Sequence, residues 1–195
     1  MAKNKFRELY DYCQTLSPKV SRNDVIRKIK ELANVDRLRV MKAALDITTI
    51  RGYFLSAKNV NHPIVKAHGT DVIVLARGLN ECWDRFVQTK EAMHLLDTEE
   101  ATVSSAEIFE GLLNDFETPS AQPNQQLISD WSAIWMALAC LCPEKDRLSY
   151  ESLRNKKQID DYGIALQLKI PEQYVPLLFR REYRMIIDNL LAEVD

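Results

Sequence analysis

Residues that interrupt regular secondary structure are scarce in this chain. Its 195 residues include five glycines and seven prolines, the residue types that most often end helices and form tight turns. With 46% hydrophobic and 28% charged residues, the chain has enough apolar material for an ordinary core in one domain. The sequence therefore predicts a mainly helical protein.

Two N-terminal segments have the apolar spacing of helices. Hydrophobic residues recur at three- and four-residue intervals in segments 6–16 and 25–32, and Ser21 is a candidate N-cap before the second. The helical pattern returns at Leu79 and continues toward the end of the chain. It is broken by a loop at 117–124 and by turns near Pro143 and Pro171.

Strand character is confined to the middle of the chain. Residues 45–57 are rich in β-branched and aromatic side chains, and residues 70–77 form a short apolar run. The loop between them is hairpin-like, so we predict an α+β fold, mostly α, with a small antiparallel sheet packed on helices. This compact unit divides into an N-terminal helical segment, a core and a C-terminal helical segment, at 1–44, 45–150 and 151–195.

Charge and cysteine content argue against several classes of protein. The chain has 26 Lys and Arg against 28 Asp and Glu, a formal net charge of −2, so no overall field attracts nucleic acid or an acidic membrane. It contains neither a signal-peptide-like apolar run nor eighteen consecutive apolar residues. The four cysteines form no Cys-x-x-Cys pair, which favours reduced, buried thiols. We expect a cytoplasmic protein without membrane contact.

The segment "VQTKEAMHLLD", residues 87–97, places two polar residues on an apolar helix face. On a helix over residues 80–96, Lys90 and His94 lie on one face. The rest of that face is apolar and consists of Trp83, Phe86 and Val87. Burying an unpaired charge there would cost several kcal/mol, so we expect a polar partner opposite Lys90 and His94.

The same residues come within one letter of the zinc-peptidase helix His-Glu-x-x-His. Histidines at i and i+4 project from one helix face and can bind one metal ion, and the glutamate at i+1 is the general base beside the metal-bound water. Here Glu91 and His94 occupy the second and last positions of that pattern, but Lys90 stands at the first ligand. A lysine ammonium keeps its proton at neutral pH and repels a divalent cation.

A candidate partner for this pair lies on a later helix, predicted over residues 125–141. Asp130 is the lone acid on a face of small residues that permits close packing of helices. We predict that this helix packs against the 80–96 helix and that Asp130 lies within reach of Lys90 or His94.

The order of these features resembles the ImmA/IrrE metallopeptidase-like family. The resemblance covers roughly residues 45–180, and Arg85 and Phe86 match the family's arginine-phenylalanine lead-in. It is carried by the strand "DVIVLAR", the stretch "RFVQTKEAMHLLD", the alanine-rich helix ending "ALACLCP" and the later "IALQLKIPEQYV". The resemblance implies a zincin-like domain.

The resemblance also implies roles for individual residues and a class of partner. Glu91 takes the position of the general base and His94 that of the second zinc ligand, while Lys90 departs from the family at the first ligand. Asp130 takes the place of an acid in the third-ligand segment, near which Ser132 also aligns. Typical family members cleave or otherwise inactivate a helix-turn-helix repressor, commonly in prophages, mobile elements or stress-response operons.

Other residues offer alternatives for the missing ligand and for the partner. His62 and His68 lie in a polar loop and are candidate replacements for the first ligand, whereas Cys82, two helical turns from Lys90, is too distant. The segment 160–180 has the pattern of a helix-turn-helix. Its second helix offers few groups for base edges, so the sequence favours ordinary helical packing over DNA binding.

We predict a degenerate, non-catalytic zincin-like protein without a metal cofactor, in which Lys90 occupies the cavity where zinc would sit, held by Glu91, Asp130 or both. Its expected partner is a protein, such as the helix-turn-helix repressor that the resemblance implies, in transcriptional or prophage and mobile-element regulation. One alternative is an active zinc metallopeptidase with Zn²⁺ held by His94, Asp130 and a replacement ligand. The other is an unrelated helical regulatory protein.

Overall fold

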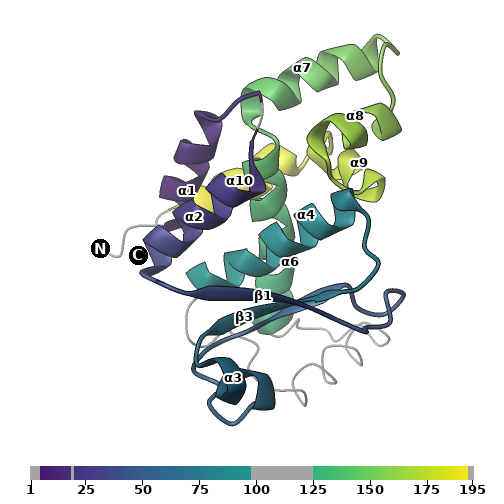
Figure 1. Cartoon of the computed structure of the whole chain (residues 1–195). Coiled ribbons are helices and arrows are strands. Elements are labelled where there is room, and N and C mark those ends of the chain that lie inside the picture. The colour runs from purple at the N-terminus through teal and green to yellow at the C-terminus, as the bar shows by residue number, and fades with distance from the viewer. Residues whose placement is uncertain (1–4, 19, 98–124, 193–195) are drawn as a thin grey trace.

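The protein is a helical body resting on a small sheet (Figure 1). The computed structural model describes residues 5–18, 20–97 and 125–192, with side chains in the last range from Ile128 onward. The predicted loop at 117–124 lies outside the described residues. The N-terminal half contains α1 (Lys5–Gln14), α2 (Arg22–Ala33), β1 (Leu38–Ala43), β2 (Gly52–Leu55), α3 (Pro63–His68), β3 (Asp71–Ala76), α4 (Glu81–Met93) and the 3₁₀ turn η1 (His94–Leu96). The C-terminal part contains α6 (Gln125–Leu141), α7 (Glu144–Asn155), α8 (Asp161–Leu168), the 3₁₀ turn η3 (Glu172–Tyr174), α9 (Val175–Leu178) and α10 (Tyr183–Leu191).

The α+β, mostly α fold class is confirmed, but the sheet is mixed and not antiparallel. Its strand order is β1-β3-β2. β2 is antiparallel to β3, with Leu55 opposite Val72, whereas β1 is parallel to β3, with Leu38 opposite Asp71. The prediction of an all-antiparallel sheet is therefore wrong, because it omitted β1.

β1 also corrects the prediction that segment 1–44 is helical. Its side chains are half-buried or exposed and include Arg39 and Lys42, as is common for an edge strand protected from aggregation by charge. Such a strand has no apolar run from which it can be predicted. The central strand β3 behaves in the opposite way, since Val72 to Ala76 are all buried.

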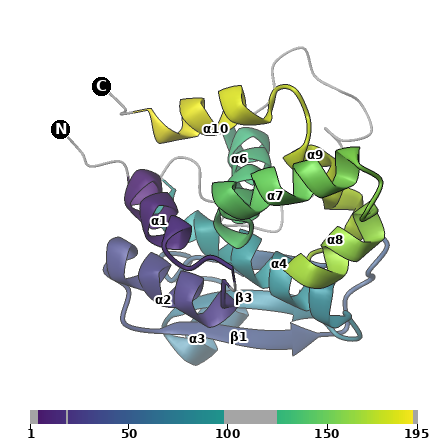
Figure 2. The ribbon, with the colours of Figure 1, turned by 90° about the horizontal axis from the view of Figure 1, so that it is seen from above.

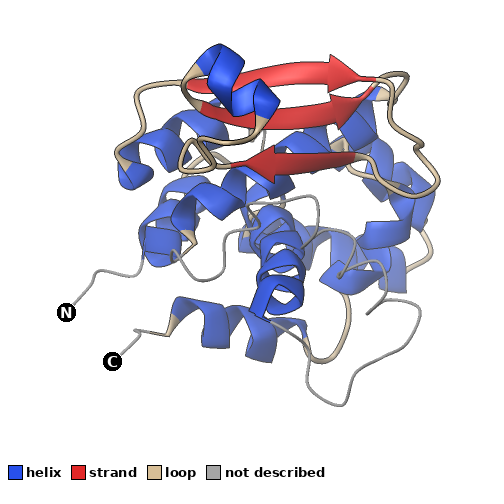
Figure 3. Ribbon diagram, turned by 90° about the horizontal axis from the view of Figure 1, so that it is seen from below, coloured by secondary structure: helices blue, strands red, loops and turns tan. Residues whose placement is uncertain are grey.

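The two faces of the sheet are covered by different helices. Ile73 and Leu75 of β3 point into the main core beneath α4, and the alternate residues Val72 and Val74 join a small second cluster with Val65 of α3. Figure 3 shows α3 on the outer side of the sheet and the other helices on the inner side. The sheet therefore separates α3 from α4.

The main core lies between the sheet and the helices, with α6 at its centre (Figure 2). α6 packs against α4, α1 and α10. Residues from all three predicted segments share this core, among them Leu9, Phe86, Leu138 and Ile187. The cysteines are free thiols, and three of them are buried. No helix in the described ranges is long and apolar enough to cross a membrane.

The segment with the helix-turn-helix pattern packs onto α4. Lys169, at a φ of 52°, ends α8, and the chain turns into η3 and α9. There Tyr174 stacks on Phe86 with ring centroids 4.4 Å apart and meets the edge of Trp83 at 5.8 Å. Glu172 and Gln173 are exposed in the would-be second helix. The segment is thus attached to α4 through the ring of Tyr174.

Candidate functional site

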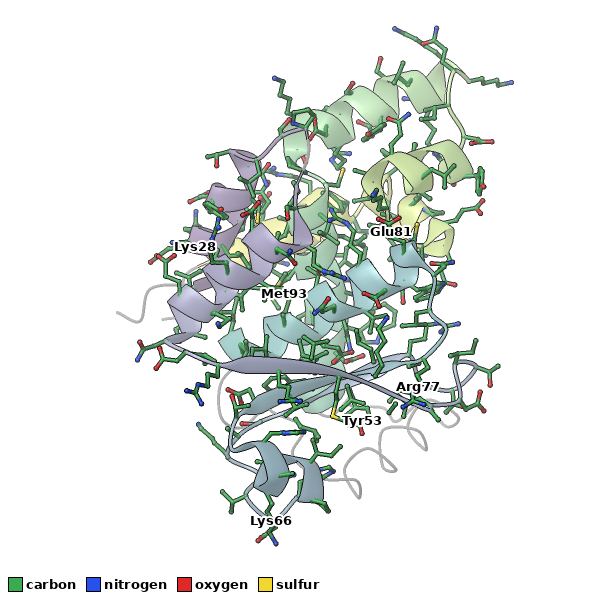
Figure 4. All side chains as sticks on the ribbon, viewed as in Figure 1. Lys28, Tyr53, Lys66, Arg77, Glu81 and Met93 are labelled. Carbon is green, nitrogen blue, oxygen red and sulfur yellow. The ribbon has the colours of Figure 1, made fainter. Side chains whose placement is uncertain are left out.

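The candidate site is built on α4, the helix predicted over residues 80–96. The side chain of Asn80 accepts a hydrogen bond from the backbone N–H of Trp83 at 2.9 Å and so caps the helix. The helix runs over the inner face of the sheet from Glu81 to Met93, both labelled in Figure 4. At His94 it tightens into the 3₁₀ turn η1, so the predicted helix is confirmed with an altered last turn.

Lys90 is held between two carboxylates, one from its own helix and one from α6. Its side chain is 13% exposed, and Nζ donates to Oε1 of Glu91 at 3.0 Å and to Oδ1 of Asp130. The side chain of Glu91 is only 4% exposed, and that of Asp130 is 34% exposed. The prediction that α6 packs on α4 and brings Asp130 to Lys90 is therefore confirmed.

His94 occupies the interior end of the same cluster. Its Nδ1 lies 2.6 Å from Oδ2 of Asp97, and its Nε2 lies 3.5 Å from Oδ1 of Asp130 and 3.8 Å from Oε2 of Glu91. The hydroxyl of Ser129 donates to Oδ2 of Asp97 at 2.6 Å and lies 3.2 Å from Nδ1 of His94. Each ring nitrogen of this buried imidazole therefore faces a carboxylate.

The aromatic ring of Phe54 on β2 covers His94 from the sheet. The two rings are stacked at 26° with centroids 6.2 Å apart. Because Phe54 is itself buried, it shields the imidazole from water and strengthens the interactions of His94 with its carboxylate neighbours.

Burial and these contacts shift the pKa values of Lys90, Glu91, His94 and Asp130. Burial alone would lower the pKa of Lys90, but the charges of Glu91 and Asp130 outweigh it and raise that pKa. Burial likewise opposes the charged form of His94, yet its hydrogen bonds to Asp130 and Asp97 raise its pKa to about 9. Lys90 and His94 are therefore both cationic at neutral pH.

The two carboxyl groups nearest Lys90 shift in opposite directions. Burial raises the pKa of Glu91, with the charges of Lys90 and His94 only partly compensating. At Asp130, burial is outweighed by the charge of Lys90 and the hydrogen bond from His94, so the pKa falls. The cations of the cluster therefore favour the ionised form of Asp130 more strongly than that of Glu91.

Part of this arrangement matches the surroundings of a metal-binding histidine. A ligand histidine usually donates one ring N–H to a carboxylate and keeps the other nitrogen for the metal. In the same way, Nδ1 of His94 lies beside the carboxylate of Asp97, and its Nε2 points toward Asp130 and Glu91. The residue set as a whole does not fit a zinc ion. The ammonium of Lys90 contacts both nearby carboxylates and would repel a dication.

His62 and His68 are not near this cluster. His62 caps α3, where its Nδ1 accepts a hydrogen bond from the backbone N–H of Ile64 at 3.2 Å, and His68 ends the same helix. Since α3 lies on the far side of the sheet from α4 (Figures 1 and 3), neither of these two candidates is placed to supply the missing first ligand. Cys82 lies in the first turn of α4, as expected.

Two members of the cluster, Asp97 and Ser129, were missed by sequence reasoning. Asp97 follows His94 by three residues, a helical i, i+3 spacing at which an acid can meet a histidine, so a signal existed. Ser129 differs in no visible way from other serines in the sequence, yet its hydroxyl donates to Asp97 in the cluster. Ser132, the serine that aligns near the third-ligand segment, is half-buried. Arg85, which matches the arginine of the family's lead-in, donates a hydrogen bond to the backbone carbonyl of Val20 at 2.8 Å.

Comparisons of the chain with protein-family models, with curated proteins and with solved structures gave no match.

Proposed function

We propose that this chain is a non-catalytic, zincin-like protein that acts by binding another protein. In this proposal the ammonium of Lys90 takes the place of a metal ion and joins α4 to α6, and the fold serves as an interaction module. The observation that carries the proposal is the contact of Lys90 with both Glu91 and Asp130.

The chemistry of the cluster supports the loss of hydrolysis in particular. A metallopeptidase needs an open metal position and a glutamate free to take a proton from the bound water. Here Glu91 is buried and accepts a hydrogen bond from Lys90, and Asp130 is paired with the same ammonium. Glu91 is therefore engaged by a cation where a general base would have to be free, and Oδ1 of Asp130 already contacts the same cation.

The partner in this proposal is a transcriptional regulator, because of the sequence resemblance to the ImmA/IrrE family. Members of that family act on helix-turn-helix repressors, and we propose a partner of that kind, bound without cleavage. A role in prophage or mobile-element regulation belongs to the same proposal.

Zinc uptake tests the proposal directly. Protein purified without chelators is expected to hold far less than one zinc per chain by elemental analysis, because Lys90 repels the ion. Lys90→His is expected to bind zinc, since it supplies the first ligand beside the Nε2 of His94 and the carboxylate of Asp130. Lys90→Gln is the matched control, because it removes the charge and adds no strong ligand.

Two results would contradict the proposal. Stoichiometric zinc in the wild-type protein would favour the metallopeptidase alternative. If folded Lys90→His took up no more zinc than Lys90→Gln at saturating metal, the cluster would not be a former zinc site, and an unrelated helical regulator would remain.

A further inference from the structure

The outer face of α6 exposes apolar side chains beside the charged cluster. Ile128 is 51% exposed and Trp131 is 48% exposed, while Asp130 between them in the sequence is 34% exposed and reaches inward to Lys90. At 100° per residue the three lie on one continuous arc of the helix, with Trp131 between the other two. We call these three residues the α6 surface.

The exposure of Trp131 is unusual for its residue type. Tryptophan is largely buried on average, and the neighbouring Trp135 on the same helix is only 7% exposed, with its ring 6.1 Å from that of Tyr183. Tryptophan is enriched in protein interfaces and among the residues that contribute most to binding. The α6 surface therefore places an exposed tryptophan, a residue type favoured in interfaces, beside the carboxylate of Asp130.

Charge decides what kind of partner group this surface accepts. Of the ionised groups in the cluster, the cations Lys90 and His94 are 13% and 7% exposed, whereas the carboxylate of Asp130 is 34% exposed. The buried cations face inward and the most exposed charge is negative, so the potential at the α6 surface favours a cation.

We propose that the α6 surface binds a protein segment that presents an arginine next to an aliphatic side chain. The guanidinium pairs with Asp130 and stacks on the indole of Trp131, and the aliphatic group packs on Ile128. Arginine suits this position better than lysine because its planar group can stack on an aromatic ring while donating to a carboxylate. The inference deepens the proposed function, on which it rests, by naming the chemistry of the partner.

Random peptide display against the full chain tests this inference. Peptides are selected on the wild-type protein, and the enriched sequences are expected to contain arginine beside leucine, isoleucine or valine. Their affinity is then measured for wild type, Trp131→Ala and Leu166→Ala, a matched control whose side chain is 53% exposed on α8. Trp131→Ala is expected to weaken binding by about tenfold or more, and Leu166→Ala to leave it unchanged.

The charge is tested on the peptide, so that the buried cluster stays intact. Replacing the peptide arginine by citrulline, which keeps the shape and removes the charge, is expected to weaken binding by about tenfold, and added salt should weaken the arginine peptide alone. Circular dichroism confirms that each protein variant is folded.

Several outcomes overturn the inference. These are an absence of enriched peptides, enrichment of acidic peptides, or equal affinity for Trp131→Ala and wild type. A dimer that becomes a monomer in Trp131→Ala, seen by sedimentation, would show that a second copy covers the surface instead. The zinc content of the same preparations is a separate readout, so failure here is distinguishable from failure of the proposed function.

Discussion

A single lysine determines the character of the buried cluster. Lys90 contacts Glu91 and Asp130, and its side chain is too enclosed, at 13% exposure, for the ammonium to reach bulk water. The charge of Lys90 therefore has to be balanced by groups inside the protein. Removing one partner of a buried ion pair leaves the others uncompensated, which costs more than the pair itself contributes.

Lys90→Ala is expected to lower the free energy of unfolding by about 3–5 kcal/mol at pH 7.5. The control is Lys42→Ala, because Lys42 forms an ion pair of 2.6 Å with Asp84 but is 53% exposed, and its loss should cost less than about 1 kcal/mol. Both values come from chemical denaturation. Similar small losses in the two variants would mean that Lys90 contributes no buried pairing.

The same variant should respond to acid. Without Lys90, the pKa of Glu91, already raised by burial, rises further, so the folded state binds a proton more readily than the unfolded state. Stability of the variant is then regained as the pH falls through that folded-state pKa. The gap between wild type and Lys90→Ala should be smaller at pH 5.5 than at pH 7.5, and a constant gap would contradict this explanation.

The contribution of His94 to the stability of the wild-type protein should be lost as the pH rises. Its pKa is raised from 6.5 to about 9 in the folded protein by Asp130 and Asp97, which overcome burial, and this difference corresponds to about 3 kcal/mol. That stability is fully present below about pH 6.5, the unfolded-state pKa of histidine, and is lost as the pH rises through 9. Unfolding free energies at pH 6.5 and pH 10 measure the loss.

The matched variant for this prediction is His94→Gln, which keeps a polar side chain and cannot ionise. It is needed because unfolded thiols also titrate near pH 8.5 and lower stability in every variant. The difference between wild type and His94→Gln should shrink by about 3 kcal/mol over this range. A difference that stays constant would show that His94 is neutral in the folded protein.

The elements show which parts of the fold can be predicted from the sequence. The long helices and the buried strand β3 have regular apolar patterns, and the pairing of Lys90 with Asp130 follows from polar residues placed on apolar faces. β1 has no such pattern, because it is an edge strand and its parallel partner β3 begins 33 residues after it. Ser129 could not be predicted, since its role depends on how α6 is rotated against α4.

Close approach of β2 to α4 leads to a prediction at this scale. A Cβ added to Gly52 would lie 2.7 Å from Cγ1 of Val87 and 2.8 Å from the carbonyl oxygen of Val74. Gly52→Ala must therefore push β2 away from its neighbours, and such overpacking costs about 1–3 kcal/mol. Thermal or chemical unfolding of the variant measures the loss.

A double variant separates this contact from a general effect of the glycine. In a Val87→Ala background the clash with Cγ1 is gone while that with the Val74 carbonyl remains, so Gly52→Ala should cost less there than in wild type. Equal costs in both backgrounds would show that the side chain of Val87 is not responsible.

At the scale of the whole molecule, helices that precede the sheet in the sequence and helices that follow it share one core. Residues of α1, α2, α4, α6 and α10 all contribute to it, and Tyr174 attaches the C-terminal segment to α4 through Phe86. The predicted division at residues 44 and 150 therefore does not coincide with any break in the hydrophobic core. A core of this kind favours cooperative unfolding.

We expect a single unfolding transition. The three tryptophans, Trp83, Trp131 and Trp135, all lie in α4 and α6, whereas circular dichroism reports on helices throughout the chain. The denaturant midpoints from tryptophan fluorescence and from circular dichroism should therefore coincide. Midpoints that differ would show that the terminal helices unfold separately from α4 and α6.

The positive charge between α4 and α6 is part of the polypeptide itself. Chelators, metal starvation and competition between metals in the cell therefore cannot remove or exchange it. Every copy of the chain acquires this charge during translation, in a fixed ratio of one per molecule. The charge that joins α4 to α6 is thus present in every folded chain, where it contacts Glu91 and Asp130.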